Sequence, residues 1–100
     1  MEATIGRIVH YRLSESDADV INRHRSHTQA SHRNEETGMQ VHVGNAVRPG
    51  DYFPAMVVRT WGDGAAALQL QVFLDGNDTH WATSRLEGDA DGQWTWPPRA

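Results

Sequence analysis

Short β-type segments separated by tight turns fill the second half of the chain, and this pattern restricts the possible folds more than any other feature. Four segments are expected as strands, at 52–61, 68–74, 79–86 and 93–96, with turns rich in glycine and aspartate between them. Strands at this spacing predict an antiparallel meander, and several short strands in a small chain commonly close into a barrel. We therefore expect a mainly β fold of the α+β class, either a small antiparallel β-barrel or a strongly bent sheet.

The first half of the chain predicts one more strand and one helix. Residues 5–12 alternate loosely between apolar and polar side chains, as a half-buried strand does. Asp17 follows Ser14 by three positions, which is a capping box with the shorter acid, and acidic residues crowd the turn that follows. One N-terminal α-helix over 15–24 is expected.

The segment after this helix is almost devoid of apolar side chains. It cannot bury enough surface to offset its ordering entropy, so 25–38 is expected as a mobile loop or a frayed extension of the helix. Residues 39–43 alternate cleanly and predict a short strand, and 97–100 are expected as a tail. A chain of 100 residues predicts a single domain, 1–100.

Composition excludes several functional classes. The chain has no cysteine, so disulfides, zinc–thiolate sites and thiolate nucleophiles are excluded. The net charge of −4 and the absence of a basic run disfavour duplex nucleic acid as a partner. No apolar run approaches the length of a membrane-spanning helix and no signal pattern opens the chain, so we expect a cytoplasmic protein without membrane association.

All nine cationic residues are arginine, which removes lysine-based chemistry. Four tryptophans, at positions 61, 81, 94 and 96, exceed what a core of this size needs. Trp94 and Trp96 are expected on one face because side chains alternate along a strand. The tryptophans either fill the core, or form a stacking platform for a base or a cage for a cation.

The hairpin expected over 68–86 carries polar groups at its tip. Asp75, Asn77 and Asp78 can bind a cation or cap their own turn. His80, Thr83 and Arg85 are expected to present donors just below the tip. Arg59 and Arg48 join them if the strand expected at 52–61 pairs alongside.

Metal binding and catalysis have little support in the sequence. His24, His27 and His32 lie in one polar segment, but spacings of three and five do not share a helical face as an i, i+4 pair does. The serines lack a nucleophile-elbow context, and the pattern places no carboxylate pair in a cleft. We therefore expect no metal site, no cofactor and no enzymatic activity.

Two resemblances add to this interpretation. The run GDYFPAMVV at 50–58, with VFLDGN at 72–77, resembles the Tudor-type pattern of small SH3-like barrels, which implies an SH3-like form for the barrel and no particular function. Nearly the whole chain resembles a group of small proteins encoded by tailed phages and prophages of actinobacteria. The stretches that carry this second resemblance are GRIVHYRLSESDADVINRHR, VGNAVRPGDYFPAMVVRTWG, LQVFLDGNDTHWATS and GQWTWPPR.

The phage resemblance implies a protein of the host cytoplasm that binds a target. Small phage proteins of this type neutralise a host component, including nucleotide signals of bacterial immunity, or take part in virion assembly. We expect a non-enzymatic homo-oligomer that captures a small anionic ligand, chiefly a nucleotide signal, in an anti-defence role. The alternative is a virion-assembly protein or an adaptor that binds a host protein through the barrel edge.

The ligand site expected from these residues lies around the hairpin. Trp81 would stack on a base, while Arg59 and Arg85 would hold phosphate. The remaining members of the expected ligand-binding set are Asn77, Asp78, Thr83, His80, Trp61 and Arg48.

Overall fold

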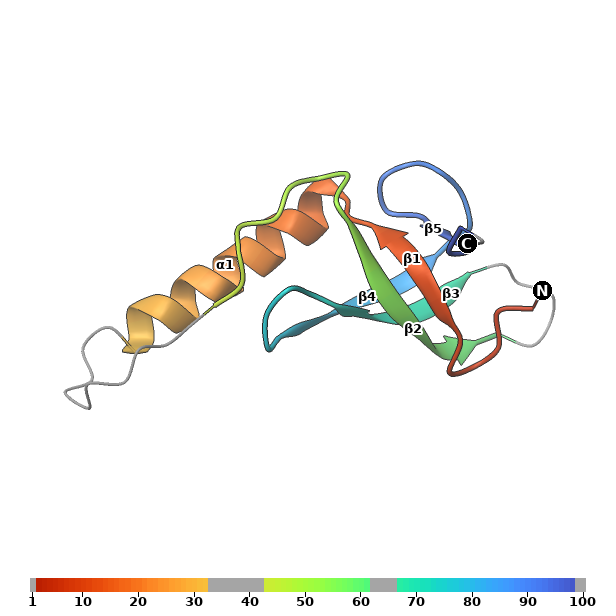
Figure 1. The fold of residues 1–100 in the computed structure, drawn as a ribbon, viewed down its shortest axis with the longest axis horizontal. Helices are drawn as coiled ribbons and strands as arrows, with labels where there is room; N and C mark the ends of the chain where they lie inside the picture. Colours follow the sequence, from red (N-terminus) through yellow and green to blue (C-terminus); the bar gives the residue numbers. More distant parts are fainter. Residues whose placement is uncertain (1, 33–42, 62–66, 99–100) are drawn as a thin grey trace.

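One helix and one sheet make up the part of the chain that the structure, a computed structural model, describes: residues 2–32, 43–61 and 67–98 (Figure 1). The element bounds are β1 Ile8–Arg12, α1 Glu15–His32, β2 Tyr52–Thr60, β3 Leu68–Phe73, β4 Thr79–Arg85 and β5 Trp94–Thr95. The fold is therefore α+β and mainly β, as predicted. In the described ranges no helix combines the length and the apolar character needed to cross a membrane.

The five strands form a single antiparallel sheet in the order β4-β3-β2-β1-β5. The sheet is open, so of the two forms expected from the sequence, a barrel or a bent sheet, the SH3-like barrel is wrong. Closure would require the two edge strands to pair along their length, but β5 has only two residues, and a single bridge between Glu87 and Trp94 links it to the chain after β4. The first part of α1 packs through Ala18 and Ile21 against one face of the sheet, here called the inner face, and the helix then extends beyond the sheet (Figure 1).

The core lies between this inner face, α1 and the segment 43–51 that precedes β2. Strand alternation supplies it, because every second residue of β1, β3 and the first part of β2 is buried. Its members are Val9, Tyr11, Leu13, Ala18, Ile21, Val47, Ala55, Val57, Leu68, Leu70, Val72, Leu74, Ala82 and Trp94. Trp96 packs edge-on against Trp94 with ring centroids 5.6 Å apart, so these two tryptophans do share a face.

The capping box predicted at the start of α1 is confirmed. The Asp17 backbone N–H donates to Ser14 Oγ at 3.1 Å, and the Ser14 N–H donates to Asp17 Oδ2 at 2.9 Å. The helix then continues to His32, past the end expected at 24, so residues 25–32 are a helical extension, one of the two alternatives expected for this segment. The reason is that its buried stripe runs from Ala18 through Ile21 to Arg25, and a buried arginine does not register as part of an apolar pattern.

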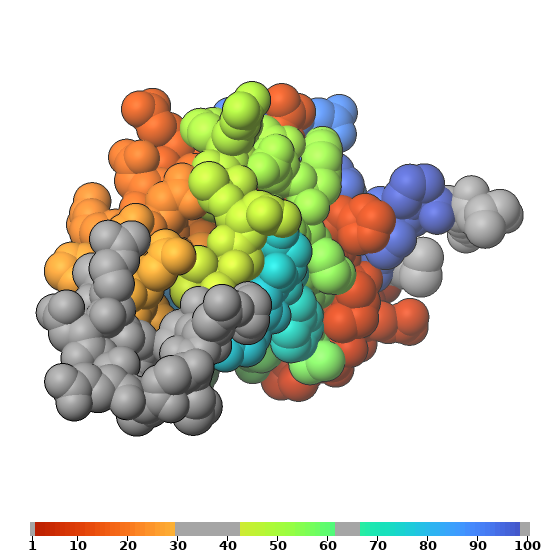
Figure 2. Space-filling view, turned by 60° about the vertical axis from the view of Figure 1, so that its left-hand side comes forward, coloured from red at the N-terminus to blue at the C-terminus, as the bar shows by residue number. Residues whose placement is uncertain are grey.

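The segment 43–51 lies between α1 and the turn that joins β3 to β4 (Figure 2). The side-chain amide of Asn22 on α1 bonds both backbone groups of Val47, at 2.9 Å each, and so attaches this segment to the helix. Residue Val43 is not in a strand, and the rest of the strand predicted at 39–43 lies outside the described residues, as do residues 33–38 of the predicted loop.

Candidate functional site

Strand β4 divides the predicted ligand site between two faces of the sheet. His80 and Ala82 point inward to α1, whereas Trp81 and Thr83 point outward and are exposed. At Ser84 the backbone adopts a φ of 54° within a register shift, and this bulge returns Arg85 to the inner side. Neighbouring residues of β4 therefore lie on opposite faces of the sheet, one facing α1 and the other facing away from it.

On the inner side, the carboxylate of Asp17 is the centre of a buried polar network. Its side chain is only 3% exposed, and it accepts hydrogen bonds from the Tyr11 hydroxyl and from Ser14 N–H. Two groups of β4 reach the same carboxylate: His80 Nε2 lies 2.9 Å and the Arg85 guanidinium 3.2 Å from Asp17 Oδ1. The capping residue of α1 is thus also the group that joins the helix to the edge of the sheet.

This network changes the acidity of two of its members. Burial alone would raise the pKa of Asp17, but the hydrogen bonds from His80, Tyr11 and Ser14 outweigh it and hold that pKa well below its usual range. Burial, reinforced by the hydrogen bond to Asp17, raises the pKa of the Tyr11 phenol well above its ordinary value. Arg85 stacks over the Tyr11 ring, 5.7 Å from its centroid, so its guanidinium is already engaged.

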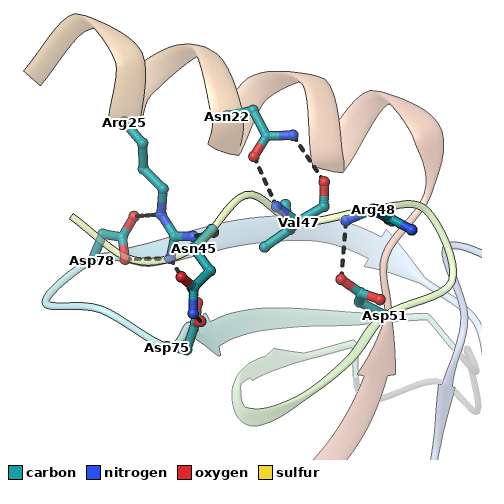
Figure 3. A network of polar contacts seen from close by, with 8 residues as sticks. All are labelled: Asn22, Arg25, Asn45, Val47, Arg48, Asp51, Asp75 and Asp78. Atoms are coloured by element: carbon teal, nitrogen blue, oxygen red, sulfur yellow. Dashed lines mark hydrogen bonds and ion pairs between the residues drawn. The ribbon is translucent and has the colours of Figure 1, made fainter. Parts of the chain in front are cut away.

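The acidic tip of the β3–β4 hairpin binds an arginine of the same chain (Figure 3). Arg25 of α1 lies 2.8 Å from Asp78 and 3.2 Å from Asp75, and it also donates to the backbone carbonyl of Asn45. Its hydrogen bonds lower the pKa of Asp78. Gly44 makes room for this arrangement, because a Cβ there would come within 2.5 Å of the guanidinium. The tip therefore anchors the helix.

A cavity of about 190 Å³ lies between α1, Val43 and the same hairpin tip. The polar part of its wall includes His24, Asn77 and His80. Arg25 also contributes to the wall, but two carboxylates already hold it. The cavity consequently offers no uncommitted arginine to a phosphate group among the residues that the structure describes.

The outer face of the sheet, opposite α1, has a different chemistry. We define it by the outward strand residues Ile8, His10, Arg12, Tyr52, Pro54, Met56, Arg59, Gln69, Gln71, Phe73, Thr79, Trp81, Thr83 and Thr95. One row crosses four strands, with Trp81 opposite Gln71, Gln71 opposite Met56, and Met56 opposite Ile8. Trp81 is 58% exposed, and Phe73 beside it is 39% exposed.

None of the five strands contains an aspartate or a glutamate, so all thirteen acidic residues lie elsewhere in the chain. Two arginines lie on the outer face. Arg12 is 2.6 Å from Asp91, whereas Arg59 stands opposite Gln69, next to the row that contains Trp81. The outer face thus combines exposed aromatic rings, side-chain amides and hydroxyls, and Arg59, which has no carboxylate among its strand neighbours.

The structure brings together three of the predicted ligand-binding residues, Trp81, Thr83 and Arg59, on this outer face. Trp61 is exposed directly after β2. The others are placed elsewhere: His80 and Arg85 contact Asp17, Asp78 contacts Arg25, Asn77 is exposed at the hairpin turn, and Arg48 is exposed before β2, where its N–H bonds Asp51. The nine residues do not form one pocket.

Sequence reasoning missed the polar partners that organise the inner side. Asp17 was identified only as a cap, and Tyr11 and Arg25 were assigned no role. The repeated Asp in the hairpin turn and the arginine in the helical stripe were the available signals, but only the fold shows that Arg25 meets Asp75 and Asp78.

In the described ranges, no three His, Asp or Glu side chains gather closely enough to hold a metal ion.

Comparison with known proteins found no matching family model, no matching curated protein and no matching solved structure.

Proposed function

We propose that this chain is a non-enzymatic binding protein that captures a small nucleotide-type anion on the outer face of its sheet. The observation that carries the proposal is the composition of this face, which combines exposed Trp81 and Phe73 with amide side chains and Arg59, and has no acidic residue in any strand. Aromatic rings on an open sheet are suited to stacking on a base, and an arginine fork is suited to a phosphate.

Trp81 supplies the stacking surface. More than half of its side chain is exposed, and its cross-strand neighbour Gln71 carries an amide that can both donate and accept hydrogen bonds. A base lying on the indole ring would therefore meet a group able to read its edge. Phe73, on the same face of β3, extends the apolar surface beside the ring.

Arg59 supplies the positive charge at a suitable separation. Gln69, which stands opposite Arg59, lies two residues along β3 from Gln71, which stands opposite Trp81. Two residues of a strand span roughly 6.5 Å, and the two strand spacings from β2 to β4 span roughly 9.5 Å, so the backbones at Arg59 and Trp81 lie roughly 11–12 Å apart. Their long side chains can therefore approach one nucleotide from its two ends. Thr83 adds a hydroxyl at the β4 end of the face.

The charge distribution favours a small anion over a long polyanion. The net charge of −4 repels an extended nucleic acid, whereas a single nucleotide meets only the local field of the acid-free strands. A nucleotide immune signal, sequestered in an infected host cell, belongs to this ligand class, and an anti-defence role is the form of the proposal that the phage resemblance suggests.

Calorimetric titration with a panel of mononucleotides and cyclic nucleotides tests the proposal. We expect Trp81→Ala to weaken binding about 5- to 150-fold, which corresponds to the loss of one base–aromatic stack of about 1–3 kcal/mol. Leu86→Ala is the matched control, because Leu86 is also 50% exposed but follows β4. Unchanged affinity in folded Trp81→Ala would remove that residue from the site.

Arg59→Gln tests the phosphate contact separately. It should weaken binding of the nucleotide and leave binding of the corresponding nucleoside unchanged, because only the phosphate uses the guanidinium. If the native protein binds no member of the panel, the proposed function is wrong.

A further inference from the structure

We propose that strand β4 pairs antiparallel with β4 of a second copy of this chain, with Trp81 opposite the partner's Trp81. The two five-stranded sheets would then form one continuous sheet across a two-fold axis. This inference concerns the edge of the sheet and does not depend on the ligand proposed above.

The edge of β4 is available for pairing. β4 is seven residues long and is hydrogen-bonded to β3 on one side, while no strand of the described ranges pairs with residues 79–84 on its other side. At the end of β4 the Arg85 carbonyl accepts a hydrogen bond from Trp94 Nε1 of β5, so the available edge ends before Arg85. An edge strand commonly carries lysine, proline or outward charges that prevent pairing with another chain. β4 has no lysine, proline or acidic residue, and its two titratable side chains, His80 and Arg85, are both turned inward to Asp17.

A second copy fits this edge because the strand is complementary to itself. In an antiparallel pairing centred on Trp81, Thr79 stands opposite the partner's Thr83, and Thr83 opposite the partner's Thr79. The outward side chains then form one Trp–Trp pair flanked by two Thr–Thr pairs, and both kinds of cross-strand pair are stabilising. On the inner side His80 stands opposite the partner's Ala82, so two imidazoles do not face each other.

The charges at the two ends of β4 favour the same orientation. Asp78 immediately precedes the strand and Arg85 is its last residue. An antiparallel arrangement keeps the two Asp78 side chains, each held by Arg25 of its own chain, at opposite ends of the interface, whereas a parallel arrangement would place them together. The bulge at Ser84 interrupts the regular strand, so the pairing segment is 79–83.

The other edge of the sheet does not offer this surface. β5 has only two residues, too few for an equivalent ladder. Pairing through β4 would join the two outer faces side by side, with the two Trp81 rings adjacent at the centre. A symmetric interface of this type uses the same patch of both copies and closes at two subunits.

Sedimentation equilibrium of the full chain without added nucleotide tests the dimer. We expect twice the 11.2 kDa mass of one chain, and we expect Trp81→Arg to be monomeric because it places like charges directly opposite each other. Phe73→Arg is the matched control, because Phe73 is exposed on the same face but lies one strand in from the edge, and this variant should remain dimeric.

Single cysteines test the register, since the chain has no cysteine of its own. Trp81→Cys should form a covalent dimer on oxidation or with a short bifunctional thiol reagent, because directly opposite Cβ atoms lie about 4.5–5.5 Å apart. Gln71→Cys should not, because its two copies would be separated by three strand spacings, about 14 Å. Thr79→Cys and Thr83→Cys should each fail to cross-link alone and should cross-link when mixed.

A monomeric mass for the native chain at its highest soluble concentration would overturn the proposal. So would a dimer that persists in Trp81→Arg, or one in which Gln71→Cys cross-links as fast as Trp81→Cys, because the interface would then lie elsewhere. A native chain that is dimeric but binds no nucleotide would contradict only the proposed function.

Discussion

The two faces of the sheet differ in how polar and apolar side chains are placed. On the inner face, charged side chains are buried and paired: Asp17 is 3% exposed and holds His80 and Arg85, and Arg25 is held by the hairpin tip. On the outer face, the side chains are mostly uncharged, and the large apolar ones are exposed. Strand β4 contributes to both faces from neighbouring positions.

This difference distinguishes the residues that stabilise the fold, on the inner face, from those available for binding, on the outer face. A buried charge that loses its partner is costly, so the inner network is committed to joining α1 to the sheet. An exposed ring such as Trp81 has no such commitment among the described residues, and its large apolar surface gains most from contact with a ligand or a second chain.

Asp17→Ala should have the largest effect, because it removes the side-chain half of the capping box, which accepts from Ser14 N–H, and leaves inward-facing polar groups without their acceptor. We expect the free energy of unfolding to fall by about 3–5 kcal/mol, the usual result of breaking a buried charged pair. Urea denaturation measures this change. Asp19→Ala, which removes an exposed acid from the same helical turn, is the control, and an equal loss in both variants would contradict the role given to Asp17.

Lowering the pH should reduce the free energy of unfolding through the same carboxylate, Asp17. The pKa of Asp17 is lower in the folded chain than the value of 3.8 expected when unfolded, so the unfolded chain binds the proton first and stability falls as the pH drops. The contribution of Asp17 to stability is complete above about pH 5 and is lost progressively below it. Asp17→Asn should have a flatter acid limb in urea denaturation at a series of pH values; an equally steep limb would assign the acid sensitivity to other carboxylates.

Arg25→Ala should have an intermediate effect of about 2 kcal/mol, because the aspartates it binds, Asp75 and Asp78, are partly exposed and can be rehydrated. Hydrogen exchange should show faster opening of α1 than of β2 and β3 in this variant. Arg23→Ala changes an exposed arginine of the same helix and should leave exchange unchanged. Uniform loss of protection would show that the hairpin tip does not anchor the helix specifically.

Trp81→Ser should have the smallest effect on the stability of a single chain, within about 0.5 kcal/mol, because Trp81 is exposed on the outer face. Leu70→Ala is the inner-face counterpart on the neighbouring strand, fully buried, and should cost about 2–5 kcal/mol. Thermal unfolding at a concentration low enough to exclude self-association compares the two. A large loss in Trp81→Ser would show that the outer face contributes to the core.

Local patterns predicted most of the elements. The capping box at Ser14 and Asp17, the three longer strands of the second half and the turn at 75–78 occur where the sequence places them, because caps, turns and strand alternation depend on neighbouring residues. The candidate site was predicted less well. Arg85 and His80 were expected beside Trp81, and the structure places them on the other side of the sheet.

The sequence by itself determined the secondary structure of most of the described chain, the exclusion of cysteine chemistry and the concentration of acidic residues outside the strands. The tertiary structure decided that the sheet stays open, that α1 continues past Arg25, and that the hairpin tip binds this arginine. The physical reason is the separation along the sequence. A cap or a strand period acts over a few residues, whereas the partners of Arg25 and Asp17 on the β3–β4 hairpin lie fifty or more residues away along the chain.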